Sequence, residues 1–216
     1  MGRVGCERGE GRVIRFPRVE KPEGFAARVE ERGARWLAVH PDAKRPHDYW
    51  SEFRPALATG FRNLCAYSAM LDLNGEVDHF VSWNENRSMA YEWANYRYAT
   101  GWINSCKSAL ASIEILDPHE VQDGWFEVSL PSLQLELSTA VPETHRARAR
   151  RCLDRLRLGH DERIMRQRRA WYAQYQAGKL SLEGLADWAP LIAAAVRKQQ
   201  AGGRSQAASR SPTRSG

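Results

Sequence analysis

The sequence predicts an α+β fold, in which a β-hairpin and the helix after it are surrounded by additional α-helices. Two observations lead to this prediction. Apolar residues flank the dipeptide Asn74-Gly75, which favours tight hairpin turns. Apolar residues at helical spacing occupy much of the remaining chain. With 216 residues, of which 43% are hydrophobic, the chain is long enough for one well-buried domain with smaller appendages.

The N-terminal part is expected to contain an arm and two helical segments. Residues 1–24 are rich in glycine and charge, with the apolar patch RVIRFPRV, and predict an arm that packs across the domain. Residues 25–39 predict a short helix broken at Gly33. Residues 46–67 place aromatic side chains on one side of a helical wheel and predict a core-facing helix, with a kink or a second start at Pro55.

The central part predicts strand, strand, helix. The hairpin is centred on Asn74-Gly75. A helix is expected to begin within residues 90–100, because polar and aromatic residues recur there at helical intervals: Tyr91, Asn95, Tyr98 and Trp102. Short alternating runs in residues 114–138 predict strands or extended segments. Residues 25–142 are therefore expected to form the main domain.

The C-terminal part is expected to be helical and basic. Residues 143–200 predict three helices, the second ending at Gly178 and the third interrupted at Pro190. Residues 201–216 are rich in Gly, Ser and Arg and predict a disordered tail.

Charge is distributed unevenly along the chain. Residues 1–142 carry 16 Lys and Arg against 20 Asp and Glu, a net charge of −4, whereas residues 143–216 carry 16 against 6, a net charge of +10. The basic part suggests attraction to a polyanion; a solvated helix face with a basic tail is the alternative. The arginine clusters at 146–151 and 163–169 fit a nucleic-acid backbone or an acidic partner protein, and we favour DNA.

Several classes of protein are disfavoured by composition. No run approaches eighteen apolar residues and the first residues lack the apolar core of a secretory signal, so we expect a cytoplasmic protein with no membrane partner. The four cysteines form no CxxC pair, which argues against a disulfide framework and a four-thiolate zinc site.

Four polar residues have the chemistry of phosphodiester hydrolysis. Such hydrolysis needs a base for the attacking water and a cation for the phosphate oxygens. His79 could supply the base, and the oxygens of Asp78 and Asn104 suit Mg²⁺ or Mn²⁺. Adjacent side chains on a strand point to opposite faces, so Asp78 and His79 can share a site only if the strand ends or bends there.

The order Asp78, His79, Asn95, Asn104 resembles that of the His-Asn-His (HNH) nucleases, which have a ββα-metal core. The resemblance implies that Asp78 and Asn104 are metal ligands, that His79 is the general base, and that Asn95 holds the connecting loop in shape. Lys107 matches a lysine of the CNxxK variants and would contact a phosphate; a plain surface lysine is the alternative. Taken singly, His79 could be a structural histidine and Asn95 a helix cap.

The segments LCAYSAMLDLNGEVDHF, YEWANYRYA, INSCK and ILDPHE extend this resemblance over residues 60–137, towards the nuclease subunits of Septu-type antiviral defence systems. It implies that DNA and an ATPase or another defence-system protein are the partners. Many members have paired CxxC knuckles that bind a structural zinc. Here these positions read Cys65 with Ser68 and Thr100 with Ile103, so we expect no structural zinc.

Two hypotheses follow. The first is an HNH endonuclease that hydrolyses DNA phosphodiester bonds with one Mg²⁺ or Mn²⁺ ion, and whose Arg166 and Arg169 bind substrate. The second is a catalytically weak or inactive nucleic-acid-binding or adaptor subunit. Aromatic residues of the central part could stack on unpaired bases, but their spacing favours a core position: Trp83, Tyr91, Trp93, Tyr96, Tyr98 and Trp102.

Overall fold

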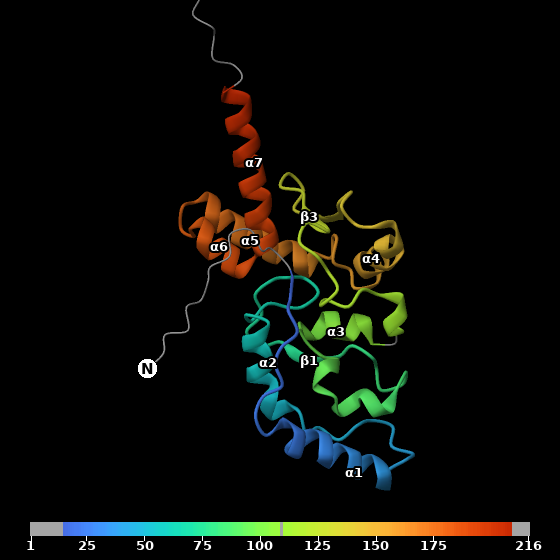
Figure 1. Cartoon of the computed structure of the whole chain (residues 1–216). Coiled ribbons are helices and arrows are strands. Elements are labelled where there is room, and N and C mark those ends of the chain that lie inside the picture. Colours follow the sequence, from blue (N-terminus) through green and yellow to red (C-terminus); the bar gives the residue numbers. More distant parts are fainter. Residues whose placement is uncertain (1–14, 109, 209–216) are drawn as a thin grey trace, which may run out of the picture.

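The computed structural model describes residues 15–108 and 110–208, with side chains to residue 202. Seven α-helices occur in this part of the chain: α1 (Glu31–Val39), α2 (Arg54–Gly60), α3 (Gly101–Lys107), α4 (Glu143–Arg155), α5 (Glu162–Gln176), α6 (Leu182–Trp188) and α7 (Pro190–Ala208). Two antiparallel sheets of two strands each accompany them (Figure 1): β1 (Glu76–His79) with β2 (Tyr96–Ala99), and β3 (Phe126–Val128) with β4 (Leu135–Leu137). The predicted α+β class is confirmed.

The described part of the N-terminal arm packs across the domain, as expected. Phe16 is buried, with its ring centroid 5.0 Å from that of Phe61. The indole nitrogen of Trp93 donates to the carbonyl of Val19 at 2.9 Å. Residues 1–14 lie outside the described residues.

The first helix is not broken at Gly33. A π-helical turn, η1 (Ala26–Glu30), runs directly into α1. A Cβ atom at Gly33 would lie 2.1 Å from the ring of Tyr91, so glycine is required there for a close approach between α1 and a later loop. The second start at Pro55 is confirmed, because the 3-10 turn η2 (Ser51–Phe53) precedes α2, whose first turn contains this proline.

The predicted hairpin at Asn74-Gly75 is wrong. Neither residue has the positive φ that a type I′ turn needs. Gly75 instead lies against Tyr98: its amide donates to the tyrosine hydroxyl at 2.9 Å, and a Cβ atom there would be 2.5 Å from the ring. The partner of β1 is β2, with Asp78 opposite Arg97 in the register.

The connection between β1 and β2 contains the 3-10 turns η3 (Arg87–Tyr91) and η4 (Trp93–Asn95). The helix expected to begin within residues 90–100 begins at Gly101, as α3. The four residues of β2 are all buried, so this strand lacks the polar alternation by which a strand is recognised. Of the two strands predicted to flank Asn74-Gly75, only the second is observed in the described part of the chain, as β1, and β2 occupies part of the segment where the helix was expected to begin.

The later elements follow the prediction closely. The strands β3 and β4 lie in the segment expected to be extended, and the 3-10 turn η5 (Ser112–Glu114) precedes them. The helix α5 ends just before Gly178, which has a φ of +68°. The interruption expected at Pro190 is observed, because α6 ends at Trp188 and α7 begins at Pro190. The helix α7 continues to Ala208, into the segment expected to be disordered, and residues 209–216 lie outside the described part.

Buried residues from Phe16 to Val196 form one continuous core. In the part of the chain that the structure describes, no helix has the length and apolar character needed to cross a membrane.

Candidate functional site

Asp78 is buried in an ion pair with Lys107. The ammonium nitrogen of Lys107 lies 3.0 Å from Oδ1 of Asp78, and both side chains are 2% exposed. The hydroxyl of Tyr67 donates to Oδ2 at 2.5 Å. Burial, with the nearby Asp78 carboxylate as a second cause, raises the pKa of Tyr67 well above its ordinary value, so this hydroxyl keeps its proton. Both oxygens of Asp78 therefore have partners.

Asn104 lies one turn before Lys107 on the same helix. Its amide nitrogen donates to Oε2 of Glu76 at 3.2 Å. Glu76 and Asp78 are two residues apart on β1 and so point to the same face of the strand. The helix α3 thus presents Asn104 and Lys107 to a face that carries two carboxylates. The end of this face near Glu76 is open to solvent, whereas the end near Asp78 is closed.

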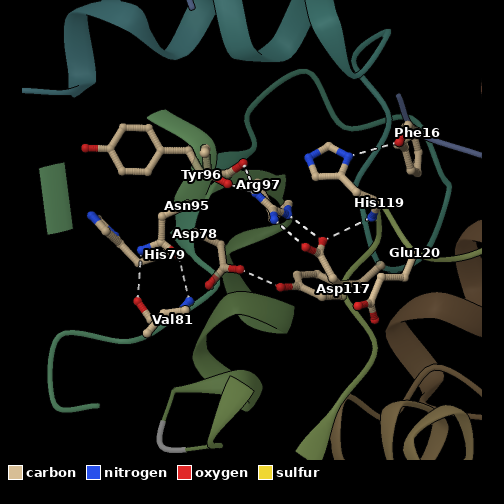
Figure 2. Close-up of polar contacts among 12 residues, drawn as sticks. Phe16, Asp78, His79, Val81, Asn95, Tyr96, Arg97, Asp117, His119 and Glu120 are labelled. Atoms are coloured by element: carbon tan, nitrogen blue, oxygen red, sulfur yellow. Dashed lines mark hydrogen bonds and ion pairs between the residues drawn. The ribbon is translucent and has the colours of Figure 1, made fainter. Parts of the chain in front are cut away.

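His79 is the last residue of β1, and its side chain points away from that of Asp78 (Figure 2), so the strand does not bring the two side chains to one face as a shared site would require. Its Nε2 lies 2.9 Å from the carbonyl oxygen of Ala90. A carbonyl only accepts, so Nε2 carries the proton and Nδ1 of the neutral ring keeps a lone pair. Among the described residues, none is hydrogen-bonded to Nδ1. Burial lowers the pKa of His79 from its ordinary value of 6.5, which favours the neutral ring at pH 7.

The imidazole of His79 is held between two aromatic rings. Its centroid is 4.5 Å from that of Trp50 and 5.0 Å from that of Tyr96, both in edge-to-face geometry. The backbone carbonyl of His79 accepts from the ammonium of Lys107 at 2.7 Å. One lysine therefore contacts the side chain of Asp78 and the backbone of His79 at the end of the strand.

Asn95 fixes the loop between β1 and β2 (Figure 2). Its side chain is 2% exposed; Oδ1 accepts from the amide of Val81 at 2.7 Å, and Nδ2 donates to the carbonyls of Val81 and Met89 at 3.0 and 2.9 Å. Met89 precedes Ala90, whose carbonyl holds the imidazole of His79. Asn95 thus acts on His79 through the loop, and its side chain does not cap a helix.

The oxygen donors near α3 suit a hard divalent cation in kind. Glu76, Asp78 and Asn104 offer carboxylate and amide oxygens, which Mg²⁺ and Mn²⁺ prefer. The positive charge that faces Asp78 in the structure is, however, the ammonium of Lys107. A metal ion can reach this carboxylate only if Lys107 moves away. In the described part of the chain, no three His, Cys, Asp or Glu side chains converge as a cation site.

The alternative of a plain surface lysine at position 107 is wrong, because this side chain is buried. Of the aromatic residues expected in the core, Tyr91, Trp93, Tyr96 and Tyr98 are buried there, while Trp83 and Trp102 are partly exposed. At one of the zinc-knuckle positions, the sulfur of buried Cys65 accepts from the amide of Thr100 at 3.3 Å.

The sequence reasoning missed a buried ion pair behind the site. Arg97, opposite Asp78 on β2, binds both oxygens of Asp117 at 2.8 and 2.6 Å (Figure 2). The pair holds the pKa of Asp117 below its ordinary value despite burial, which opposes the shift. The imidazole of His119 contacts the carbonyl of Phe16, which is a structural role. The motif ILDPHE contains Asp117, but the pattern gives no sign of its partner.

The arginines of α5 divide into exposed and buried ones. Arg166 is exposed and lines an open hollow of about 470 Å³ with Trp102 and Arg163, whose guanidinium lies 4.1 Å above the Trp102 ring. Arg169 is exposed beside Glu162 at 3.4 Å. Arg168 is buried against backbone carbonyls, and burial lowers its pKa to about 10.

Part of the arginine cluster on α4 serves the fold. Arg148 lies 2.9 Å from the carboxylate of Glu120, and Arg151 pairs with Glu114. These contacts attach α4 to the segment before β3. The two arginines are therefore engaged within the chain and are less available to nucleic acid than Arg166.

Comparisons of the chain with protein-family models, with curated proteins and with solved structures give no match.

Proposed function

We propose that the chain is an endonuclease of the HNH type that hydrolyses DNA phosphodiester bonds with the help of a divalent cation. The observation that supports this most strongly is the state of His79. Its lowered pKa favours the neutral imidazole, and its Nε2–H donates a hydrogen bond to the Ala90 carbonyl. The Nδ1 lone pair is therefore available to accept a proton. This is the state that a general base requires.

His79 would take the proton from the attacking water at Nδ1. A lowered pKa keeps most of the imidazole in the basic form near neutral pH. Asn95 keeps the loop carbonyl in place, and Trp50 and Tyr96 restrict the ring. These residues would hold one tautomer and one orientation of the base, which lowers the cost of reaching the reactive geometry.

Asp78 and Asn104 would hold Mg²⁺ or Mn²⁺. When bound, the ion would stabilise the negative charge that develops on the phosphate oxygens. Lys107 would leave Asp78 at this stage, and its ammonium would then be available to a substrate phosphate. Exposed Arg166 and Arg169 would bind the DNA backbone beside α3.

The resemblance to the nuclease subunits of Septu-type systems supports a cytoplasmic role in antiviral defence, with an ATPase or another defence protein as the partner.

The test is nicking of supercoiled plasmid DNA by the purified chain in Mg²⁺ or Mn²⁺. We expect nicking by the wild type and a loss of about 10²- to 10⁴-fold in His79→Ala, the range for removal of a general base. His160→Ala, an exposed histidine on another part of the surface, is the matched control and should retain activity. Equal rates for the two variants would refute the role of His79.

A second function, a nucleic-acid-binding or adaptor subunit without cleavage, is favoured by one observation. Asp78 is sealed from solvent and already neutralised by Lys107. A chain with this function would bind oligonucleotides yet leave plasmid intact at every concentration of Mg²⁺ or Mn²⁺.

A further inference from the structure

A series of aromatic rings leads from His79 towards the surface. Trp50 is 4.5 Å from the imidazole of His79 and 5.9 Å from Tyr91, which is in turn 5.9 Å from Tyr49. These distances between ring centroids are those of packed aromatic pairs. The general base of the proposed reaction is therefore in contact with a continuous aromatic layer.

The outer end of this layer is accessible to solvent. Tyr49 stacks on the exposed ring of His47 at 4.4 Å, and Trp36 stacks on the exposed ring of His40 at 4.7 Å. Trp36 also lies 6.4 Å from Trp83. Trp36, Tyr49 and Trp83 pack against the core and are all partly exposed.

Arginines lie beside the exposed rings. The guanidinium of Arg32 is 4.4 Å above Tyr49, and that of Arg87 is 5.1 Å above Trp83. An open hollow of about 350 Å³ is lined by Arg32, Arg35, Trp36, Val39 and Tyr49. Residues 32–50 carry four Lys and Arg against two Asp, so this region is positive although residues 1–142 as a whole are negative. We call Trp36, Tyr49, Trp83, Arg32, Arg35 and Arg87 the aromatic-arginine surface.

We propose that the aromatic-arginine surface binds an unpaired strand of nucleic acid and leads it towards His79. A base could stack on these partly exposed rings in place of the histidine or arginine side chain that now covers them, and the arginines would then offer charge to phosphates. The bases of a duplex already stack on one another and cannot use such rings, so the combination selects an unpaired strand. The direction towards His79 rests on the proposed nuclease function, whereas the binding itself does not.

The test is fluorescence polarisation with labelled oligothymidine, oligouridine and a DNA duplex of the same length. The full chain is used in EDTA, so that no metal-dependent cleavage occurs. We expect one or both single strands to bind more tightly than the duplex, and the preferred strand identifies DNA or RNA as the source. Trp36→Leu should weaken this binding by about 5- to 100-fold, which is the effect of losing one base–aromatic stack.

Two controls separate this effect from changes in folding and in overall charge. Trp188→Leu removes a tryptophan that is 39% exposed on α6, and Arg155→Gln removes an exposed arginine on α4. Both should bind as the wild type does. Arg32 is exposed, so Arg32→Gln should not disturb the core. It should reduce the slope of log affinity against log salt concentration by about one, as expected for the loss of one phosphate contact.

The proposal is overturned if the duplex binds more tightly than both single strands, or if Trp36→Leu and Arg32→Gln bind as well as their controls. If the chain prefers single strands and Trp36→Leu weakens this binding, but no nicking of plasmid is found, the aromatic-arginine surface is supported and the nuclease function is refuted. The reverse result, cleavage of plasmid by a chain whose Trp36 and Arg32 variants bind normally, refutes the surface alone.

Discussion

The ammonium of Lys107 and the carboxylate of Asp78 form an ion pair that is closed to solvent, at 3.0 Å. Such a pair stabilises a fold only while both partners are present, because either charge alone would be buried without compensation. Lys107 thus has a structural role in this arrangement, and it occupies the place where a metal ion would neutralise Asp78.

Removing the lysine should therefore destabilise the fold. We expect Lys107→Ala to lower the free energy of unfolding by about 3–5 kcal/mol, the range for breaking a buried pair. Urea denaturation at neutral pH measures it. The double variant Asp78→Asn with Lys107→Met leaves no buried charge and should be more stable than Lys107→Ala. If Lys107→Ala were as stable as the wild type, the pair would not exist in solution.

The same variant should respond more strongly to divalent cations. Without Lys107, the carboxylate of Asp78 needs another positive charge, and an ion that binds only the folded state raises the melting temperature. We expect Mn²⁺ to raise the melting temperature of Lys107→Ala more than that of the wild type. The additional change Asp78→Asn should abolish the difference. An equal response in all three proteins would show that Asp78 binds no cation.

Asn95 should be important for stability as well as for activity. Asn95→Ala removes three hydrogen bonds and leaves the amide and carbonyl of Val81 without these partners, a loss of about 2–4 kcal/mol. Denaturation measures it, together with faster hydrogen exchange at the Val81 amide. Asn86→Ala removes an exposed cap of η3 and should cost about 1 kcal/mol or less. Similar losses in both variants would contradict the role of Asn95 in the loop.

The titration of His79 gives a test by pH. Burial lowers its pKa in the folded state, so the imidazole should titrate below 6.5 in the folded chain and near 6.5 in urea. As the pH falls from 6.5 to the folded-state pKa, the unfolded state binds the proton first. The contribution of His79 to the free energy of unfolding, which is present above pH 6.5, is therefore lost over this interval. The histidine NMR signals of the wild type and of His79→Gln identify the resonance. A folded pKa above 6.5 would contradict the burial of the ring.

Gly33 should not tolerate a methyl group. A Cβ atom there would overlap the ring of Tyr91, so Gly33→Ala should destabilise the fold despite the higher helix propensity of alanine. Gly202→Ala, in α7 with nothing within 4 Å of the added atom, is the matched control and should be neutral or slightly stabilising. Thermal melts of both variants measure the difference. Equal stability would mean that α1 and the loop do not approach as closely as described.

The two errors in the central fold have the same physical origin. Local propensity favoured a turn at Asn74-Gly75, but Gly75 instead makes a tertiary contact: its amide donates to the hydroxyl of Tyr98 and its backbone packs against the tyrosine ring. The segment Tyr96–Ala99 is buried on both faces, and a short buried strand cannot be told from a helix by periodicity. Where the backbone preferences of a single proline or glycine decided the local structure, the prediction was confirmed, as at Pro55, Gly178 and Pro190.

The sequence indicated where the candidate residues lie in the fold, but not the contacts that they make. The order of Asp78, His79, Asn95 and Asn104 along the chain indicated the elements that now lie together as β1, the loop and α3. The partners of these residues depend on packing between distant segments. No local pattern predicts that Lys107 turns inward to Asp78, or that Tyr67 donates to the same carboxylate.

The most direct measurement of the central claim is anomalous X-ray diffraction at the manganese edge from crystals of the full chain grown with Mn²⁺. We expect a peak within coordination distance of both the Asp78 carboxylate and the Asn104 amide, with Lys107 displaced from Asp78. A site without manganese, in which Lys107 still contacts Asp78 at a saturating concentration of the ion, would contradict it.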